Sequence, residues 1–222
     1  MKDIAEAFRF PFRDPDWISK FLVGALMVLF SLLLVGLFFL LGYYIRTTQR
    51  AMRKEANPLP DWSNLGGLFV LGLKYALVYL VYLLPIIVVV FLFIVVAVVT
   101  AATQSQESFL PLIIFFYAFI FFLLVPYSLA LTVLSPVISI HFALKEEMRD
   151  GLALSTIVRF FTKNWAQALI VAVLIYGLES IEGIGILFFI VGIFFSIFYV
   201  GLVGHHLMGQ LYLASLEPKE AT

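Results

Sequence analysis

This chain of 222 residues has no cysteine and few charged side chains. Without cysteine it cannot form disulfides, thiolate metal sites or a cysteine nucleophile. Asp, Glu, Lys and Arg together make up 13% of the sequence, and their formal charges sum to zero. A protein without net charge has no overall field that would attract nucleic acid. We therefore expect no nucleic-acid partner.

The few charges are distributed so that three long runs contain none: residues 21–45, 75–106 and 108–144. A charged side chain at the bilayer centre costs several kcal/mol, so helices that cross a membrane are charge-free apolar runs of roughly 20 residues. The remaining composition agrees, with 63% hydrophobic and 17% aromatic residues. The sequence thus predicts an all-α integral membrane protein, a helical bundle in a lipid bilayer.

We predict a single membrane domain over residues 1–222 with about five transmembrane helices. The predicted spans are residues 21–45, 75–103, 109–144, 165–178 and 186–213. The third span is too long for one straight crossing, because at about 1.5 Å per residue it exceeds a hydrocarbon core about 30 Å thick. We expect this helix to be broken at its three prolines, Pro111, Pro126 and Pro136.

Shorter segments are predicted to lie on the membrane surface. Residues 1–16 form an N-terminal interfacial segment, which is unlike a cleavable signal peptide, and Asp14 is expected to cap the helix that follows. Residues 65–73 read as a separate entry helix, and residues 214–222 as a polar tail. The clearest helical period is in residues 151–162, where an apolar stripe recurs at i, i+3, i+4 and i+7: Leu154, Ile157, Val158 and Phe161.

Lys and Arg concentrate in residues 46–63 and 145–163, which predicts that these loops and the C-terminus face the cytoplasm across the cell membrane. Five spans would then leave the N-terminus outside, although residues 1–20 carry four basic side chains. Either the N-terminus does lie outside, or residues 21–45 form a re-entrant hairpin about Val35-Gly36. The distribution of charge leaves both alternatives open.

Several motifs are spread over the chain: Phe10-Pro11-Phe12-Arg13-Asp14-Pro15-Asp16-Trp17, Gly42-Tyr43-Tyr44-Ile45-Arg46, Leu59-Pro60-Asp61-Trp62, Gly72-Leu73-Lys74, Phe198-Tyr199 and Gly209-Gln210-Leu211-Tyr212. Together they resemble a prokaryotic multi-pass membrane family catalogued as domain-of-unknown-function family 4013. The resemblance covers nearly the whole chain and implies a helical membrane fold, but no activity, substrate or cofactor. Residues 30–40 lack the mid-helix proline associated with the family, which weighs against the re-entrant hairpin.

Five basic residues near the ends of the predicted spans are candidates for contact with lipid headgroups or other anions: Arg46, Arg50, Arg53, Lys54 and Lys74. Each basic group near an anionic membrane surface is worth about 1 kcal/mol of attraction. The alternative is that the arginines only mark topology and that Lys74 extends its ammonium group to the interface.

Three histidines and one pair of small residues are further candidates. His141, His205 and His206 lie near the same ends of their predicted spans and could form a polar cluster; the alternative is that they face different neighbours. No carboxylate or cysteine lies at ligand spacing, so we expect neither a metal nor a cofactor. Gly192 and Ser196 form a small-xxx-small pair that would let another helix approach closely.

Enzyme signatures are missing from the sequence, which has no Walker loop, His-Glu-x-x-His, Gly-x-Ser-x-Gly or paired carboxylates within a span. We therefore expect no enzymatic activity and predict a structural or assembly partner that organises the membrane together with other membrane subunits or copies of itself. The alternative is a small homo-oligomeric transporter or channel for a lipid-like or apolar solute. Buried polar residues around a central cavity would favour transport, whereas exposed apolar faces would favour assembly.

Overall fold

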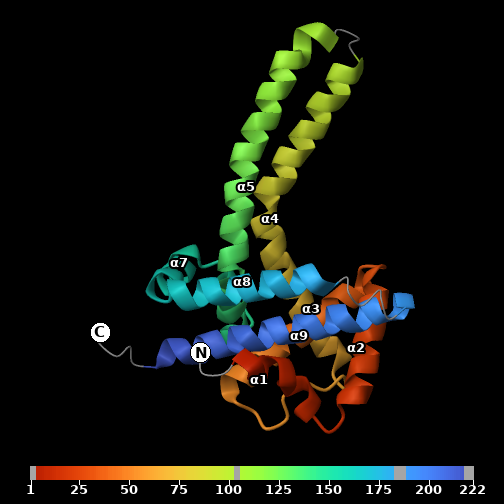
Figure 1. Ribbon diagram of the computed structural model, residues 1–222, viewed down its shortest axis with the longest axis vertical. Helices are drawn as coiled ribbons and strands as arrows, with labels where there is room; N and C mark the ends of the chain where they lie inside the picture. Colours follow the sequence, from red (N-terminus) through yellow and green to blue (C-terminus); the bar gives the residue numbers. More distant parts are fainter. Residues whose placement is uncertain (1–3, 103–105, 183–188, 218–222) are drawn as a thin grey trace. The chain divides into compact units, whose positions relative to one another are not determined.

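The computed structural model describes residues 4–102, 106–182 and 189–217, and every regular element in these ranges is helical (Figure 1). In chain order the elements are α1 (Ile4–Arg9), the 3-10 helix η1 (Phe10–Arg13), α2 (Trp17–Ser31), α3 (Val35–Arg53), α4 (Leu65–Ala102), α5 (Gln106–Lys145), α6 (Met148–Gly151), α7 (Leu154–Lys163), α8 (Trp165–Ile181) and α9 (Phe189–Leu216). The predicted all-α class is confirmed. The predicted polar tail lies largely outside the described residues.

Three helical segments among the described residues are long and apolar enough to cross a bilayer: Leu65–Val99, Tyr117–Lys145 and Val191–Leu216. A fourth crossing exists if α7 and α8, which meet at an angle of 99°, count as one broken span. Three to four candidate spans agree with an integral membrane protein, and this count is close to the predicted number of about five.

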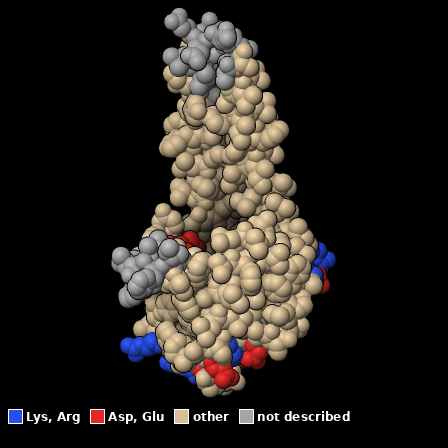
Figure 2. Space-filling model, turned by 90° about the vertical axis from the view of Figure 1, so that its right-hand side faces the viewer, with Lys and Arg blue, Asp and Glu red and all other residues tan. Residues whose placement is uncertain are grey.

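The chain divides into two compact units, Met1–Val78 with Val133–Thr222, and Tyr79–Thr132. The second unit consists of the later part of α4 and the earlier part of α5. Its sequence holds one charged residue, Glu107. On the face drawn in Figure 2, its described atoms accordingly include no Lys, Arg, Asp or Glu, whereas the first unit carries both signs of charge.

The two long helices α4 and α5 are each continuous. α4 begins at Leu65, where the side chain of Asn64 accepts a hydrogen bond from the backbone N–H of Gly67 over 2.9 Å, and no separate entry helix precedes the span. α5 runs through all three of its prolines without the break that we expected. A proline removes one backbone hydrogen bond and bends a helix, but the bonds of the neighbouring turns can hold it together.

Residues 21–45 form two helices that pack against each other. Between α2 and α3 the backbone of Leu34 is left-handed, with φ of 63°, and this turn reverses the chain. Close to the turn, the carbonyl oxygen of Met27 in α2 occupies the place that a Cβ on Gly36 would need. A continuous helix over residues 21–45, one of the two alternatives left by the sequence, is therefore not formed.

The predicted amphipathic segment corresponds to α7, which begins at Leu154 after the short helix α6. Ile157 is fully buried, whereas Leu154 and Val158 are 55% and 45% exposed. Only part of the apolar stripe therefore packs against protein. The chain bends from α7 into α8 at Asn164, whose side-chain amide donates to the carbonyl oxygen of Phe160 over 3.0 Å.

Candidate functional site: a buried ion-pair cluster

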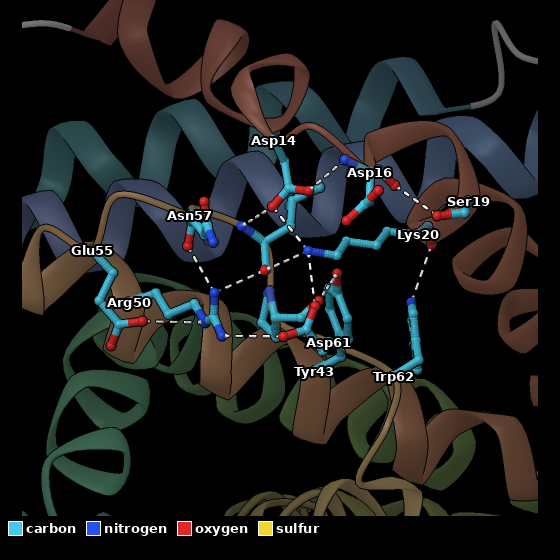
Figure 3. A network of polar contacts seen from close by, with 12 residues as sticks. Asp14, Asp16, Ser19, Lys20, Tyr43, Arg50, Glu55, Asn57, Asp61 and Trp62 are labelled. Carbon is cyan, nitrogen blue, oxygen red and sulfur yellow. Dashed lines mark hydrogen bonds and ion pairs between the residues drawn. The ribbon is translucent and has the colours of Figure 1, made fainter.

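Asp14 and Lys20 form the centre of a polar cluster in the first unit (Figure 3). The carboxylate of Asp14 is fully buried and lies 2.9 Å from the Lys20 ammonium group. It also accepts hydrogen bonds from the backbone N–H groups of Leu59, at 3.3 Å, and Asp16, at 3.0 Å. The expectation that Asp14 caps the following helix is wrong, because α2 begins only at Trp17 and a distant loop engages the carboxylate instead.

Lys20 and Arg50 hold the loop between α3 and α4 against this centre. The Lys20 ammonium group contacts Asp61 at 3.0 Å and donates to the carbonyl oxygen of Leu59 at 3.1 Å. Arg50 donates to the same carbonyl oxygen at 2.9 Å and to that of Asn57 at 2.7 Å. A buried charge is tolerated only when it is paired and hydrogen-bonded, so these groups depend on one another.

Two aromatic side chains cover the cluster. Tyr43 donates its hydroxyl to the carbonyl oxygen of Pro60 at 2.9 Å, and its ring stacks on Trp62 with the centroids 4.2 Å apart. The indole N–H of Trp62 donates to the carbonyl oxygen of Lys20 at 3.1 Å. Lys20 at the start of α2 is thereby fixed beside Tyr43 in α3. Since the opposite ends of these helices meet at the Leu34 turn, α2 and α3 run antiparallel.

Four glycines let the helices of this unit approach one another closely. A Cβ on Gly42 would collide with the backbone of Leu68 in α4, and one on Gly72 would collide with the backbone of Phe38 in α3. In the same way, Gly24 and Gly201 provide space for the aromatic rings of Phe198 and Tyr44, respectively. Half of these residues belong to the motifs that the sequence singled out. The buried core of the unit contains residues from four of those motifs, namely Phe10, Tyr43, Tyr44, Leu59 and Phe198.

A second ion pair connects α3 with the end of α5. Arg46 makes two hydrogen bonds to the Glu146 carboxylate, at 2.6 and 3.2 Å, and Gln49 donates to the same group at 3.0 Å. Burial alone would raise the pKa of Glu146. The hydrogen bonds from Gln49 and Arg46, with the positive charges of Arg46 and Lys74, outweigh this effect and lower its pKa.

A cavity of about 290 Å³ adjoins the cluster at Arg50. Charged residues of both signs line it, namely Glu6, Arg13, Arg50, Lys54 and Glu55, together with the polar side chains of His206 and Gln210. Arg13 lies 2.7 Å from Glu6 and Arg50 lies 3.4 Å from Glu55, so these opposite charges already face each other. The space therefore offers a mixed polar surface without a concentration of one charge.

The five basic residues that we considered for lipid or anion contact have different surroundings. Arg46 and Arg50 are engaged by protein groups, as described above. Arg53 is 67% exposed and lies 3.8 Å from Glu55. Lys54 and Lys74 are exposed, and Lys54 ends α3 in a left-handed conformation with φ of 53°.

The three histidines do not converge. His141 contacts the ring of Phe160, His205 stacks on Tyr44, and His206 stacks on Phe10. Within the described ranges, no group of three His, Asp or Glu residues is placed to hold a metal ion.

Gly192 and Ser196 are both half-buried in α9. The Ser196 hydroxyl donates to the carbonyl oxygen of Glu182 at 2.8 Å. This bond joins the end of α8 to α9 within the chain, and the prediction that the small pair receives another helix stays a prediction.

Most residues of this cluster belong to the motifs noted in the sequence, but the sequence alone did not indicate a functional role for them. The available signal was the repetition of an Asp-Trp pair before two apolar segments, at Asp16-Trp17 and Asp61-Trp62. Such a pair is also expected wherever a helix begins at the membrane surface. The repetition does not show that Asp14 and Lys20 contact the segment at Asp61-Trp62.

Comparison with known proteins identifies a family and no individual relative. The sequence model of a family described as "Protein of unknown function (DUF4013)" matches residues 25–200. This range includes the α2–α3 turn and Asp61-Trp62, but it begins after Asp14 and Lys20. No match was found among curated proteins or among solved structures.

Proposed function

We propose that this chain, which belongs to the family described as "Protein of unknown function (DUF4013)", is a non-catalytic membrane subunit that acts through helix–helix and lipid contacts. Two observations support an assembly role over chemistry. Residues of four of the quoted motifs lie in the buried core of the first unit. The sequence of the second unit is predominantly apolar and holds one charged residue.

The observation that carries the proposal is an apolar stripe on α5. Phe115, Phe119, Phe122 and Leu129 recur at i, i+4, i+7 and i+14, so they lie on one side of the helix. Their exposed fractions are 67%, 53%, 76% and 61%. Bulky side chains on one face of a membrane helix pack readily against a neighbouring helix, in a second copy of the chain or in another membrane protein.

The second unit is held together well enough to present this face. Tyr127 donates its hydroxyl to the carbonyl oxygen of Tyr82 at 2.7 Å, and the rings of Phe93 and Tyr117 meet at 4.7 Å. These contacts tie α5 to α4 on the side away from the stripe. A two-helix unit leaves most of its surface open, so an added helix has room to pack.

The test is site-specific cross-linking in native membranes. A photo-reactive residue at Phe122 should give a discrete adduct, either with another copy of the chain or with one membrane protein. Changing Phe115, Phe119 and Phe122 to Leu should preserve insertion and reduce adduct formation through a reporter at Leu129 at least several-fold. The matched control changes Ile114 and Phe121 to Leu, since both are 60% exposed on another face of α5.

Two results would contradict the assembly role. One is cross-linking at Phe122 to lipid alone, combined with a single copy per particle in mild detergent. The other is a saturable solute flux through vesicles that contain only this protein, which would support the transport alternative.

Contact with anionic lipid is the second part of the proposal, and it concerns Arg53 and Lys54. Both are exposed and adjacent, whereas Arg46 and Arg50 are used within the protein. Changing both exposed residues to Gln should lower the amount of co-purifying anionic lipid by a few-fold, because each charge contributes about 1 kcal/mol. Lys163→Gln is the control for an exposed lysine elsewhere. Equal amounts of anionic lipid in the wild type, the double variant and Lys163→Gln would contradict this contact.

A further inference from the structure

The turn between α2 and α3 exposes four consecutive large apolar side chains. Leu32, Leu33, Leu34 and Val35 are 75%, 71%, 67% and 53% exposed. Leu34 also adopts the left-handed backbone that leucine rarely takes. In water such a tip would be unfavourable, because each leucine would keep most of its apolar surface hydrated.

The two ends of this helical pair are tied together at the base. The Lys20 ammonium group, at the start of α2, binds Asp61, which follows α3. Asp14, which precedes α2, receives the backbone N–H of Leu59 from the same loop. Charged groups that touch within 3.0 Å cannot lie on opposite sides of a hydrocarbon core about 30 Å thick.

The lengths of α2 and of the apolar part of α3 fit a chain that enters the membrane and returns to the same side. α2 has 15 residues, which corresponds to about 22 Å at 1.5 Å per residue. The apolar part of α3, residues 35–45, corresponds to about 16 Å before Arg46. Both lengths fall short of a hydrocarbon thickness of about 30 Å, yet they reach well beyond the headgroups.

We infer that residues 21–45 are a re-entrant hairpin, which inserts Leu32, Leu33 and Leu34 among the acyl chains of one leaflet. It enters from the side of the membrane that holds the basic loop at residues 46–63. The N-terminal segment lies on that same side. The occupant of the exposed tip is lipid, because the hairpin contains no charged residue and its base is closed by the ion-pair cluster.

This arrangement removes the conflict in the charge distribution. If residues 21–45 crossed the bilayer once, the four basic residues before them would lie opposite the basic loop. A hairpin returns the chain to its starting side, so these four residues add to the basic side in agreement with the positive-inside rule.

The experiment uses single cysteines, because the chain has none of its own. Arg13→Cys and Arg53→Cys replace side chains that are 60% and 67% exposed, and Leu33→Cys places a thiol at the tip. A membrane-impermeant maleimide is applied to vesicles of each orientation. We expect Arg13→Cys and Arg53→Cys to react from the same side and Leu33→Cys to react from neither.

A second measurement identifies what covers the tip. A fluorophore on Leu33→Cys should be quenched severalfold more by lipids brominated on their acyl chains than by aqueous iodide. Labelling of Arg13→Cys and Arg53→Cys from opposite sides would show a spanning segment and overturn the inference. Reaction of Leu33→Cys with the impermeant reagent would place the tip in water, and protection from both quenchers would place it against protein; either result overturns the lipid assignment.

Discussion

Asp14 and Lys20 are buried charges, and each compensates the charge of the other. Asp14 accepts three hydrogen bonds, and the Lys20 ammonium group contacts two carboxylates and a carbonyl oxygen. Removing one partner of a buried pair leaves the other charge without compensation, which costs far more than an exposed pair contributes. At the scale of single residues, the cluster therefore clamps the start of α2 to the loop between α3 and α4.

The first prediction concerns the charge of Asp14. Asp14→Asn keeps the shape of the side chain and removes the charge that compensates Lys20, so we expect a loss of about 2–3 kcal/mol in unfolding free energy, since Asp61 still partly compensates Lys20. Thermal unfolding in detergent, with its midpoint as the readout, measures the loss. Asp16→Asn is the control, since Asp16 is exposed and its side chain makes no capping hydrogen bond. Equal midpoints for the two variants would show that Asp14 is not part of a clamp.

At the scale of elements, glycines permit the close helix packing within the first unit. Gly42 and Gly72 permit the crossing of α3 and α4 with backbone against backbone. Without a hydrophobic driving force between helices in lipid, such close approach is a main source of association. This backbone contact explains why glycines stand at positions 42 and 72 of the two sequence motifs.

The second prediction tests this crossing by adding one methyl group. Gly42→Ala and Gly72→Ala should each destabilise the protein by about 1–3 kcal/mol, because the new Cβ meets a backbone carbonyl that cannot move aside. Gly66→Ala adds the same methyl group to α4 where nothing lies within 4 Å. That control should be neutral or slightly stabilising, since alanine favours helix. If Gly42→Ala and Gly72→Ala were as stable as Gly66→Ala, the packing argument would be contradicted.

The third prediction concerns the link between α3 and the end of α5. The pKa of Glu146 is lowered in the folded protein, so its ion pair contributes stability above the ordinary pKa of 4.5 and loses it as the pH falls through the lowered value. The effect should be below about 1 kcal/mol, because both side chains of the pair are 36% exposed. We expect Glu146→Gln to reduce the loss of stability between neutral and acidic pH, measured by unfolding midpoints. Glu147→Gln, at an exposed neighbour, should retain the full pH dependence.

The long apolar helices could be predicted from sequence, whereas the reversal of the chain between α2 and α3 stayed one of two open alternatives. A charge-free run identifies α4 and α5 because crossing lipid requires such a run. Residues 21–45 have the same composition whether they cross or return. The reversal occurs at Leu34, a residue type that gives no turn signal, and it is enforced by Lys20 binding Asp61 about 40 residues away. The site was missed for the same reason, since its motifs reveal their role only when they meet.

At the scale of the whole molecule, the ion pairs and the chain connectivity constrain the sides of the membrane. The start of α4 and the end of α5 both belong to the first unit, and Arg46 in α3 binds Glu146 just after α5. We therefore expect the basic loops at residues 46–63 and 145–163 to share one side. The segment that joins α4 to α5 carries no Lys or Arg, which is typical of the opposite side.

The last prediction is that Arg149 and Gln104 lie on opposite sides of the membrane, with Arg149 in the cytoplasm. Gln104 lies outside the described residues, and its expected side rests on the prediction that α4 and α5 each cross the bilayer. Cysteines at the two positions should react with an impermeant maleimide in vesicles of opposite orientation, whereas Arg149→Cys and Arg53→Cys should react in the same vesicles. Modification of Arg149→Cys and Gln104→Cys from one side would mean that α4 and α5 do not cross the bilayer. In that case the apolar stripe around Phe122 would lie along one membrane surface, and the assembly role proposed for it would lose its physical basis.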